Sequence, residues 1–498
     1  MRVGSAVCLA AGLLVAACTT PESGSPQSPE SAAAARFDLI RHSPPALRAF
    51  LEAMPKGGDI HSHLSGTVYA ESFIAWASED GLCLQRSSLS LAEPPCTGED
   101  GAAPPVAAIA RHDVLRSAMI DAWSMRDFVP GEESGHDHFF ATFGKFGATR
   151  DAREGDMLAE AAARAAAQNI GYLELMNSLR RAEASRIARS REWRGDIADY
   201  HRALLDAGLR DLVPLAVADT DTVEARRDAL LGCGTADADP GCEVEVRYLQ
   251  QVIRAFPPGE VYAQILLGFE IAKADPRVVG LNLVAPEDGP IALRDYSLHM
   301  EIIGYLKSLM PEMRVTLHAG ELTLGLVDPK ELKFHIREAV EVAGATRIGH
   351  GVDIAYEDGH DALLARMAQE GILVEIALTS NDVILGVEGD EHPFEMYREA
   401  GVPLALATDD EGVSRIDLTH EFQRAAETYD LDYRDLKNLA RNSLAYSFLA
   451  GPRLRELEEC LADFLAAACE AAAAAAGDKA REQWELERAF EVFESAFQ

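Results

Sequence analysis

Short apolar runs alternate with longer amphipathic segments along most of the chain. Several runs are almost continuously apolar, which is typical of parallel strands buried on both faces. The segments between them, such as 155–169 and 329–343, have helical spacing and composition. Strands that alternate with helices in this way predict a (β/α)8 barrel. The expected strands are 58–63, 171–176, 243–249, 278–284, 314–318, 347–350, 372–378 and 404–408.

The spacing of these runs is uneven in one place. More than 100 residues separate the first two expected strands, far more than a strand-to-helix connection needs. Residues 81–135 contain two cysteines, a Pro-rich loop and several turn signals, so we expect an insertion near the barrel mouth. The tail from Leu454 to Gln498 is predicted to be mostly helical. The barrel domain would thus comprise residues 37–498.

The N-terminal segment predicts export. A basic residue, Arg2, precedes an apolar stretch that is too short to span a bilayer, as in a signal peptide over residues 1–17. Small residues before Cys18 resemble the lipobox of bacterial lipoproteins, which implies cleavage before Cys18 and lipidation of its thiol. An ordinary cleaved signal peptide would also export the chain. Residues 18–36 are rich in Pro, Ser, Ala and Glu and predict a disordered tether.

Export would place the protein at a periplasmic or surface face of a bacterial membrane, and Thr19 favours the outer membrane. The oxidising compartment makes disulfides plausible for the remaining cysteines. Local bridges Cys83–Cys96 and Cys233–Cys242 would each close a Gly- or Pro-containing loop. The 460–469 segment has a helical pattern, and nine residues of helix rise about 13 Å, too far for one bridge. Either the helix breaks there or Cys460 and Cys469 do not pair.

The charge balance excludes two classes of partner. The chain has 46 basic and 81 acidic residues and a net charge of -35. Such a surface repels nucleic acid and anionic membranes, so membrane contact is expected only through the lipid anchor. It also argues mildly against a highly phosphorylated substrate.

Ionisable residues follow four of the expected strands. Active sites of such barrels lie at the carboxyl ends of the strands. Each group alone could be structural, because strand-end histidines often make hydrogen bonds and Asp pairs often cap helices. Their occurrence together on one barrel edge favours a site. The groups are His61 and His63, His318 and Glu321, His350, and Asp409 with Asp410.

These residues form a complete set for metal-assisted hydrolysis. In an extended strand, His61 and His63 point to the same side. Together with His318 and Asp409 they offer three imidazoles and one carboxylate, a donor set that Zn²⁺ accepts. One zinc ion would make water nucleophilic at neutral pH. Glu321 would act as an acid or base, and His350 would hydrogen-bond the water, take its proton or stabilise developing charge.

The same motifs resemble the adenosine deaminase family of metal-dependent amidohydrolases. The resemblance runs from about residue 54 to 449 and includes MPKGGDIHSHLSG, LHAGE, IGHG, ALTSN with HPF, and ATDDEGVSR in the family's order. VVGLNLVAPED and the long insertion are closer to the secreted adenosine deaminase growth factor branch.

The resemblance implies hydrolytic deamination of adenosine or 2′-deoxyadenosine to the inosine product and ammonia. Glu321 would protonate N1, while zinc-activated water attacks C6 with His350 and Asp409 beside it. Asp410 would contact N7. The loop containing Ala285 would offer a backbone donor to N3. Phe143 and Phe146 are candidate walls for the purine or ribose, although ordinary helix-core packing explains them equally well.

Two residues depart from the family pattern. Typical members have an acidic residue two positions after the second histidine, where it holds the sugar, and Ser65 occupies that position. Ala285 replaces the glycine expected to contact N3, and its methyl group narrows the approach. The substrate could therefore be adenine, a modified adenosine or another aminopurine.

Other interpretations are weaker. His136 and His138 repeat the spacing, but on a helix start these positions do not share a face. His392 precedes a proline and is expected to be a turn or cap residue. A non-enzymatic exported protein that binds nucleosides or signals would not need Glu321 and His350 beside a metal. An amidohydrolase acting on an ester or cyclic amide is a third possibility.

Overall fold

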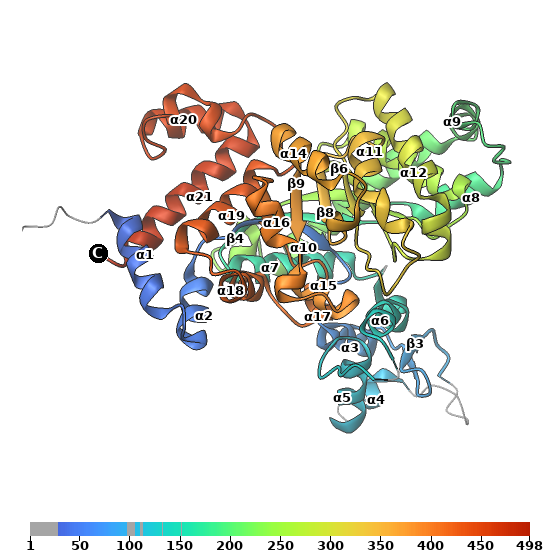
Figure 1. Cartoon of the computed structure of the whole chain (residues 1–498). Helices are drawn as coiled ribbons and strands as arrows, with labels where there is room; N and C mark the ends of the chain where they lie inside the picture. The colour runs from blue at the N-terminus through green and yellow to red at the C-terminus, as the bar shows by residue number, and fades with distance from the viewer. Residues whose placement is uncertain (1–27, 97–104, 110–112, 132, 151) are drawn as a thin grey trace, which may run out of the picture.

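Eight parallel strands form a barrel in the computed structural model (Figure 1). The structure describes residues 28–96, 105–109, 113–131, 133–150 and 152–498. The strands occur where the apolar runs predict them, with ends that differ by a few residues. They are β1 (Gly57–His63), β4 (Ile170–Asn177), β5 (Glu245–Ile253), β6 (Val278–Val284), β7 (Thr316–Ala319), β8 (Arg347–His350), β9 (Leu373–Ile376) and β10 (Leu404–Leu406).

The strands close into a ring. One half has the order β1-β4-β5-β6 and the other β10-β9-β8-β7, with every pair parallel. A parallel bridge between Leu281 and Val315 joins β6 to β7. A second bridge between Ser62 and Asp409 joins β1 to the end of β10, and it places two candidate site segments side by side. The predicted (β/α)8 barrel is confirmed.

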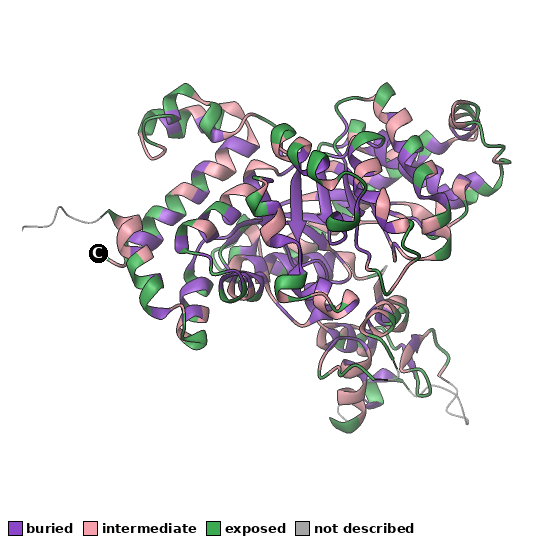
Figure 2. Ribbon diagram, in the orientation of Figure 1, coloured by how far each residue is buried: buried purple, intermediate pink, exposed green. Residues whose placement is uncertain are grey.

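Helices surround the ring and cover its apolar strands, most of whose residues are buried (Figure 2). The predicted helices at 155–169 and 329–343 correspond to α7 and to a short turn followed by α13. The helices between barrel strands are α7 (Glu154–Ala167), α8 (Arg181–Arg189), α9 (Ile197–Asp206), α10 (Val213–Leu231), α11 (Pro258–Ala274), α12 (Pro290–Leu309), α13 (His335–Glu341), α14 (His360–Glu370), α15 (Leu378–Leu385) and α16 (Phe394–Glu399). After β10 follow α17 (Glu411–Ser414), α18 (Leu418–Thr428) and α19 (Tyr433–Ala445).

The segment between β1 and β4 forms a lobe that projects from the barrel, at the lower right of Figure 1. Part of it is the predicted insertion at 81–135, and α6, its last helix, packs against α15 of the barrel. Its elements are α3 (Ala70–Glu79), the antiparallel pair β2 (Cys83–Gln85) and β3 (Ser90–Ala92), α4 (Val106–Ile109), α5 (Asp113–Ala122) and α6 (Gly135–Arg150).

The two ends of the described chain pack together. Helices α1 (Pro29–Ile40) and α2 (Pro44–Ala53) lie beside α21 (Asp478–Ser495), which follows α20 (Ala467–Ala476) in the predicted helical tail (Figure 1). The rings of Phe50 and Phe493 lie 5.0 Å apart. The prediction of a disordered tether over 18–36 is wrong for residues 29–36, because α1 begins at Pro29 and buries Ala33. Signal peptide 1–17 and Cys18 lie outside the described residues.

Three disulfides stabilise loops of the fold. They are Cys83–Cys96, Cys233–Cys242 and Cys460–Cys469, so both local bridges predicted from the sequence form. The third resolves the alternative at 460–469 in favour of a helix break. Cys460 ends a 3-10 turn and α20 begins only at Ala467, which brings the two Cα atoms to 4.6 Å.

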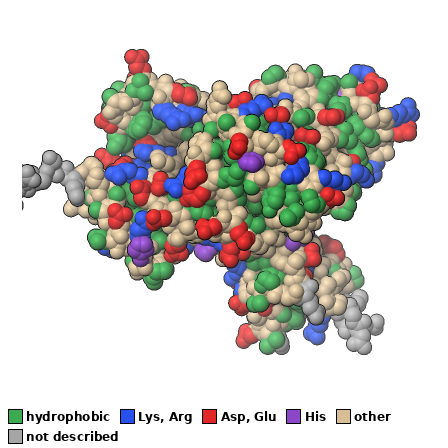
Figure 3. Space-filling view, in the orientation of Figure 1, with side chains coloured by type: hydrophobic (Ala, Val, Ile, Leu, Met, Phe, Trp, Pro, Cys, Tyr) green, Lys and Arg blue, Asp and Glu red, His purple; other side chains and the backbone are tan. Residues whose placement is uncertain are grey.

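Acidic and basic side chains are interspersed on the face shown in Figure 3, despite the net charge of -35. No helix among the described residues is both long enough and apolar enough to cross a membrane.

Candidate metal centre and active site

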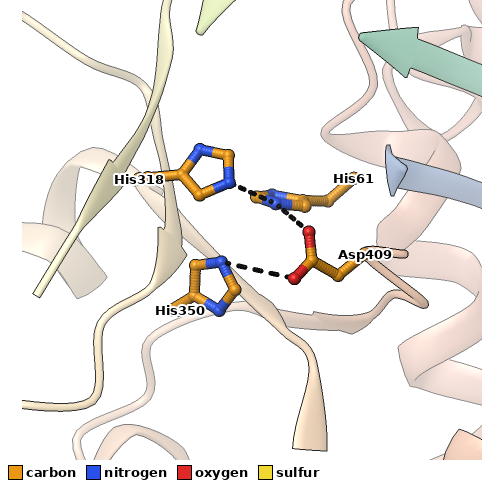
Figure 4. Close-up of side chains that lie close together, drawn as sticks. All are labelled: His61, His318, His350 and Asp409. Atoms are coloured by element: carbon orange, nitrogen blue, oxygen red, sulfur yellow. Dashed lines mark hydrogen bonds and ion pairs between the residues drawn. The ribbon is translucent and has the colours of Figure 1, made fainter. Parts of the chain in front are cut away.

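Three imidazoles and one carboxylate meet at the carboxyl ends of the strands. His61 and His63 come from β1, His318 from β7, and Asp409 follows β10. The Nε2 atom of His318 lies 3.2 Å from that of His61 and 3.3 Å from that of His63. Asp409 Oδ1 is 3.3 Å from His61 Nε2 and 3.1 Å from His63 Nε2. Figure 4 shows His61, His318 and Asp409 turned toward one another, with His350 alongside.

Each of the three imidazoles uses its other nitrogen, Nδ1, in a hydrogen bond that points away from the cluster. All three partners offer an oxygen acceptor, so Nδ1 carries the proton and Nε2 keeps its lone pair in the neutral ring. The acceptors are Glu375 for His61 (2.5 Å), Asn282 for His318 (2.9 Å) and Gln251 for His63 (2.8 Å). The three rings are thus oriented as metal ligands are.

The cluster fits a divalent cation. Neutral Nε2 lone pairs only 3.2 and 3.3 Å apart repel one another unless a positive charge lies between them. Burial alone would lower the pKa of His61, but the Asp409 and Glu375 carboxylates raise it to about 10. These carboxylates therefore stabilise positive charge at this point. Nitrogen and carboxylate donors of this kind suit zinc.

His350 lies within reach of the cluster but has the opposite tautomer. Its Nδ1 accepts from the amide nitrogen of Asn381 (2.9 Å), whose oxygen faces His392 Nε2 (3.1 Å). The backbone N–H of Phe394 donates to His392 Nδ1 at 3.1 Å, which fixes the direction of the whole chain. Because Nδ1 is an acceptor, neutral His350 carries its proton on Nε2 and is a donor, not a ligand. Burial lowers the pKa of His350 to about 4 and keeps it neutral.

Glu321 follows the β7 histidine and lies beside the cluster. Its Oε1 is 3.7 Å from His350 Nε2. Burial, followed by the charge of Asp409, raises the pKa of Glu321 to about 8, so its carboxyl can carry a proton at neutral pH. Glu287 holds the loop in place by accepting the backbone N–H groups of Gly320 (3.1 Å) and Glu321 (2.9 Å). A buried proton donor therefore stands beside the candidate metal centre.

Asp410 is the second buried carboxyl of the site. Burial is the main cause that raises its pKa to about 7, and its Oδ1 has no hydrogen-bond partner among the described residues. Gly66 makes room for it, because a Cβ at that position would lie 1.4 Å from Asp410 Oδ1. Such a carboxyl is available to a ligand.

Strained backbone conformations gather at the same barrel edge. Ala285, His350 and Asp409 adopt φ values of 82°, 68° and 59°, in the left-handed region that residues with a Cβ rarely occupy. Ala285 follows β6, where the family pattern has glycine, and its positive φ gives the physical reason for that preference. Its carbonyl accepts from Arg254 Nε at 2.8 Å, which supports the strained turn.

A cavity of about 250 Å³ leads to the cluster. Ser65 and Ala285 line it together with the buried acids Glu321 and Asp410, so these predicted residues face one space. Phe143 also lines it, on α6, whereas Phe146 does not. Phe146 is buried and stacks on Phe73 with a ring separation of 4.3 Å, so its prediction as a wall is wrong and its place is in the core.

Among the described residues, His136 and His138 do not form a second metal-binding cluster. His136 contacts Asp137 and Asp288, each at 3.0 Å, and His138 contacts Glu133 at 3.0 Å, so the two rings have separate partners. His392 is a cap residue, as expected, because its ring accepts the N–H of Phe394.

Sequence reasoning missed the residues that orient the imidazoles. Asn282, Glu375 and Gln251 lie inside strands whose other positions are largely apolar, as in VVGLNLV and ILVEIAL. A polar residue in the middle of a buried parallel strand was the available signal, since it needs a partner inside the barrel. Asn381 belongs to the ALTSN motif of the family resemblance, but the motif did not reveal its hydrogen bond to His350.

A parallel barrel that gathers imidazoles and a carboxylate at its strand ends is the architecture of the metal-dependent amidohydrolases. The adenosine deaminase family model matches residues 156–464, more than half of the chain. The chain therefore belongs to the adenosine deaminase family. The matched range excludes β1, so the placement of His61 and His63 rests on the geometry above.

Known relatives agree with this assignment. An adenosine deaminase of Clostridium perfringens is 36% identical over 149 residues, covering 30% of this chain and 40% of the relative. An N6-methyl-AMP deaminase of Danio rerio is 29% identical over 226 residues, covering 45% and 61%. These alignments span less than two thirds of the relatives. The solved N6-methyl-AMP deaminase of Arabidopsis thaliana has the same fold, with a TM-score of 0.52 and 20% identity over 81% of this chain and 94% of that one. The growth factor branch stays a prediction.

Proposed function

We propose that the protein is a zinc-dependent hydrolase that deaminates aminopurine nucleosides, with adenosine and 2′-deoxyadenosine as the first candidates. Water adds at C6 of the purine, the C6–nitrogen bond breaks, and the products are the inosine nucleoside and ammonia. The observation that carries the proposal is the buried Glu321 carboxyl, which lies beside the imidazole cluster in a cavity of about 250 Å³. The curated relatives have an aminopurine ring as the common part of their named substrates.

His61, His63, His318 and Asp409 would hold the zinc ion. When bound, zinc supplies the Lewis acidity that makes a water molecule nucleophilic at neutral pH. Ser380 donates to Asp409 Oδ2 at 2.7 Å and fixes that carboxylate, while Oδ1 faces the imidazoles.

Three side chains act on the purine and the attacking oxygen. Glu321 gives its proton to N1, which draws electrons from C6 and favours attack there. His350 donates its Nε2–H toward the oxygen that adds at C6 and stabilises the negative charge that develops on it. Asp410, with its raised pKa, donates a hydrogen bond to N7 and fixes the orientation of the purine ring.

The rest of the cavity binds the substrate without reacting. The backbone N–H of Ala285 faces N3, and Phe143 contributes an apolar wall from α6. Ser65 lies where the sugar is expected and brings no charge to it. Its neutrality widens the range of sugar substituents and leaves adenine or a modified adenosine as alternative substrates.

Export is part of the proposal. The signal-peptide pattern of residues 1–17 and the lipobox before Cys18 support a lipoprotein held at a bacterial membrane, the outer membrane first. A non-enzymatic nucleoside-binding or signalling protein is the alternative. The buried Glu321 carboxyl, whose pKa is raised to about 8, argues against it, because binding alone does not need an acid beside the cluster.

The first experiment follows the ultraviolet absorbance of adenosine with zinc-loaded protein. We expect the adenosine band to fall with the wild type and with Glu341→Gln, a half-exposed surface control. Glu321→Gln has no proton to give and should lower kcat by about 10³-fold. If zinc is bound and no aminopurine is turned over, including adenine and methylated adenosines, the enzymatic function is overturned in favour of nucleoside binding.

A further inference from the structure

Two segments of the cavity wall act on opposite sides of the purine in the proposed reaction. The turn after β6 carries Ala285, whose N–H faces N3, and the loop after β7 carries Glu321, which gives its proton to N1. Because N1 and N3 belong to one rigid ring, these two segments must keep a fixed separation. Backbone pairing alone does not ensure this, since β6 and β7 belong to different halves of the barrel. In the described chain one parallel bridge joins them, between Leu281 and Val315, and we call this boundary the β6–β7 seam.

Glu287 crosses the seam with its carboxylate. It follows Ala285 by two positions and is only 1% exposed. Its Oε1 accepts the backbone N–H of Gly320 at 3.1 Å, and its Oε2 accepts that of Glu321 at 2.9 Å. Both oxygens of one side chain on the N3 side of the cavity therefore bind the backbone that carries the N1 acid.

His335, the first residue of α13, orients this carboxylate from the side away from the cavity. Its Nδ1 donates to Glu287 Oε1 at 2.6 Å, and the ring of Tyr296 stacks on the imidazole with a centroid separation of 3.7 Å. Burial would raise the pKa of Glu287, but the His335 hydrogen bond and the charge of Arg254 lower it. The group is therefore an ionised carboxylate, which accepts hydrogen bonds on both oxygens.

Arg254 fixes the turn from which Glu287 extends. This fully buried side chain follows β5 and donates from Nε to the carbonyl of Ala285 at 2.8 Å. Its Nη1 donates to the carbonyl of His318, at the end of β7, at 3.0 Å. Because the guanidinium is planar, these two donors keep a fixed angle. The base of the turn is thus held to β7 as well, two residues before Glu287.

We propose that Glu287 is a positioning residue for the reaction, because it sets the position of the acid Glu321 relative to the N3 donor Ala285. This role rests on the proposed deaminase function and adds a residue to it. Neither Glu287 nor Arg254 lines the cavity, so Glu287 acts through the segments it binds and not by touching the purine. A displacement of a reacting group by about 1 Å can cost about 10²-fold in rate.

The kinetic test uses Glu287→Gln in the full zinc-loaded protein. The amide has the same shape, but one of its two ends is a donor and would face a backbone N–H of the acid's loop. We expect kcat for adenosine to fall about 10²-fold, with zinc content kept. Glu494→Gln is the matched control, because Glu494 is also buried and accepts from Tyr433 Oη (2.7 Å), outside the cavity lining. Equal kcat losses in the two variants would overturn the positioning role.

A double-mutant cycle distinguishes positioning from general support of the fold. If Glu287 acts through Glu321, it has little left to position once that acid is lost. Adding Glu287→Gln to Glu321→Gln should therefore lower kcat by less than about threefold, against about 10²-fold in the wild-type background. Losses that multiply in the double variant overturn the inference, because residues that act independently show additive free energies.

Hydrogen exchange tests the contact without any turnover. In Glu287→Gln the amides of Gly320 and Glu321 should exchange at least about tenfold faster, which corresponds to one lost hydrogen bond to a charged acceptor. The amide of Leu317 within β7, and all three amides in Glu494→Gln, should keep their rates. Unchanged exchange at Gly320 and Glu321 overturns the inference whether or not the protein is an enzyme. Faster exchange with normal kcat for adenosine rejects the positioning role alone and leaves the deaminase function standing.

Discussion

The barrel interior contains two groups of buried charged side chains, one at the carboxyl ends of the strands and one deeper in the barrel. In the deeper group, Arg347 binds Glu174 (2.6 Å) and Glu375 (2.5 Å), and Phe448 N–H and Tyr172 Oη donate to Glu174. In the upper group, His350 Nε2 and Asp410 Oδ1 have no hydrogen-bond partner among the described residues.

The difference indicates what each group does. Buried charges that are fully paired maintain a structure, whereas buried polar atoms without partners carry a cost that a ligand can relieve. Glu375 connects the two groups, because one oxygen binds Arg347 and the other binds His61 (2.5 Å). Burial would raise the pKa of Glu375, but Arg347 and His61 lower it to about 2 and keep it ionised. Changes in the two groups should therefore separate stability from catalysis.

The largest expected effect is on stability, in Arg347→Met. This change leaves two carboxylates buried without their cation and should lower the free energy of unfolding by about 3–5 kcal/mol. Urea unfolding followed by tryptophan fluorescence measures it. Arg366→Met removes an arginine from a surface ion pair with Glu370 and should cost less than about 1 kcal/mol. Equal losses in the two variants would show that the deeper group does not stabilise the barrel.

Asn381→Asp tests the donor role of His350. A carboxylate only accepts hydrogen bonds, so it would bind a proton on His350 Nδ1 and remove the donor at Nε2. We expect kcat to fall about 10²-fold with zinc content and melting temperature kept. The ¹⁵N chemical shifts of the His350 ring should show the proton on Nε2 in the wild type and on Nδ1 in the variant. The same change at the exposed Asn438 is the control. A wild-type ring protonated at Nδ1 would contradict the assignment.

Glu375→Gln tests the connection between the two groups. His61 would lose the carboxylate that orients its ring, and zinc affinity should fall about 10- to 100-fold. Competition with a chromophoric chelator measures the affinity directly, separately from unfolding. Glu370→Gln, on the surface, should leave it unchanged. An unchanged affinity in Glu375→Gln would assign this residue to the deeper group alone.

The smallest expected effect is a pH dependence. In the proposed reaction Glu321 must carry its proton to act, and burial raises its pKa to about 8, so the protonated form would persist through neutral pH. Above that pKa, kcat/KM should fall by about tenfold per pH unit, because each unit reduces the protonated fraction tenfold. The positive charge of bound zinc lowers the pKa, which places the fall at or below about pH 8. A flat profile to pH 10, with the protein still folded, would exclude Glu321 as the acid.

Local patterns in the sequence were sufficient to predict the barrel fold and the cluster of candidate site residues at the carboxyl ends of its strands. Continuous apolar runs fix buried parallel strands, and the residues that end those strands must lie on one edge once the barrel closes. His61, His63, His318 and Asp409 are such residues, and so are Glu321 and His350. The disulfides Cys83–Cys96 and Cys233–Cys242 were also predictable from local sequence, because each closes a short loop.

Only the tertiary structure decided which hydrogen-bond partners hold these residues, which side chains pack in the core and which cavities lie beside the cluster. The sequence pattern does not distinguish Phe143 from Phe146, which lie on the same helix. Packing decides between them, because the ring of Phe146 stacks on Phe73 in the core. The direction of the Asn381 amide, and hence the tautomer of His350, depends on His392 and on a backbone N–H that the local sequence does not reveal. A cavity of about 700 Å³ beside the active site likewise combines residues from six separate helices and strands. Strand periodicity records which face of an element is buried, whereas hydrogen-bond partners and cavities arise from contacts between elements distant in sequence.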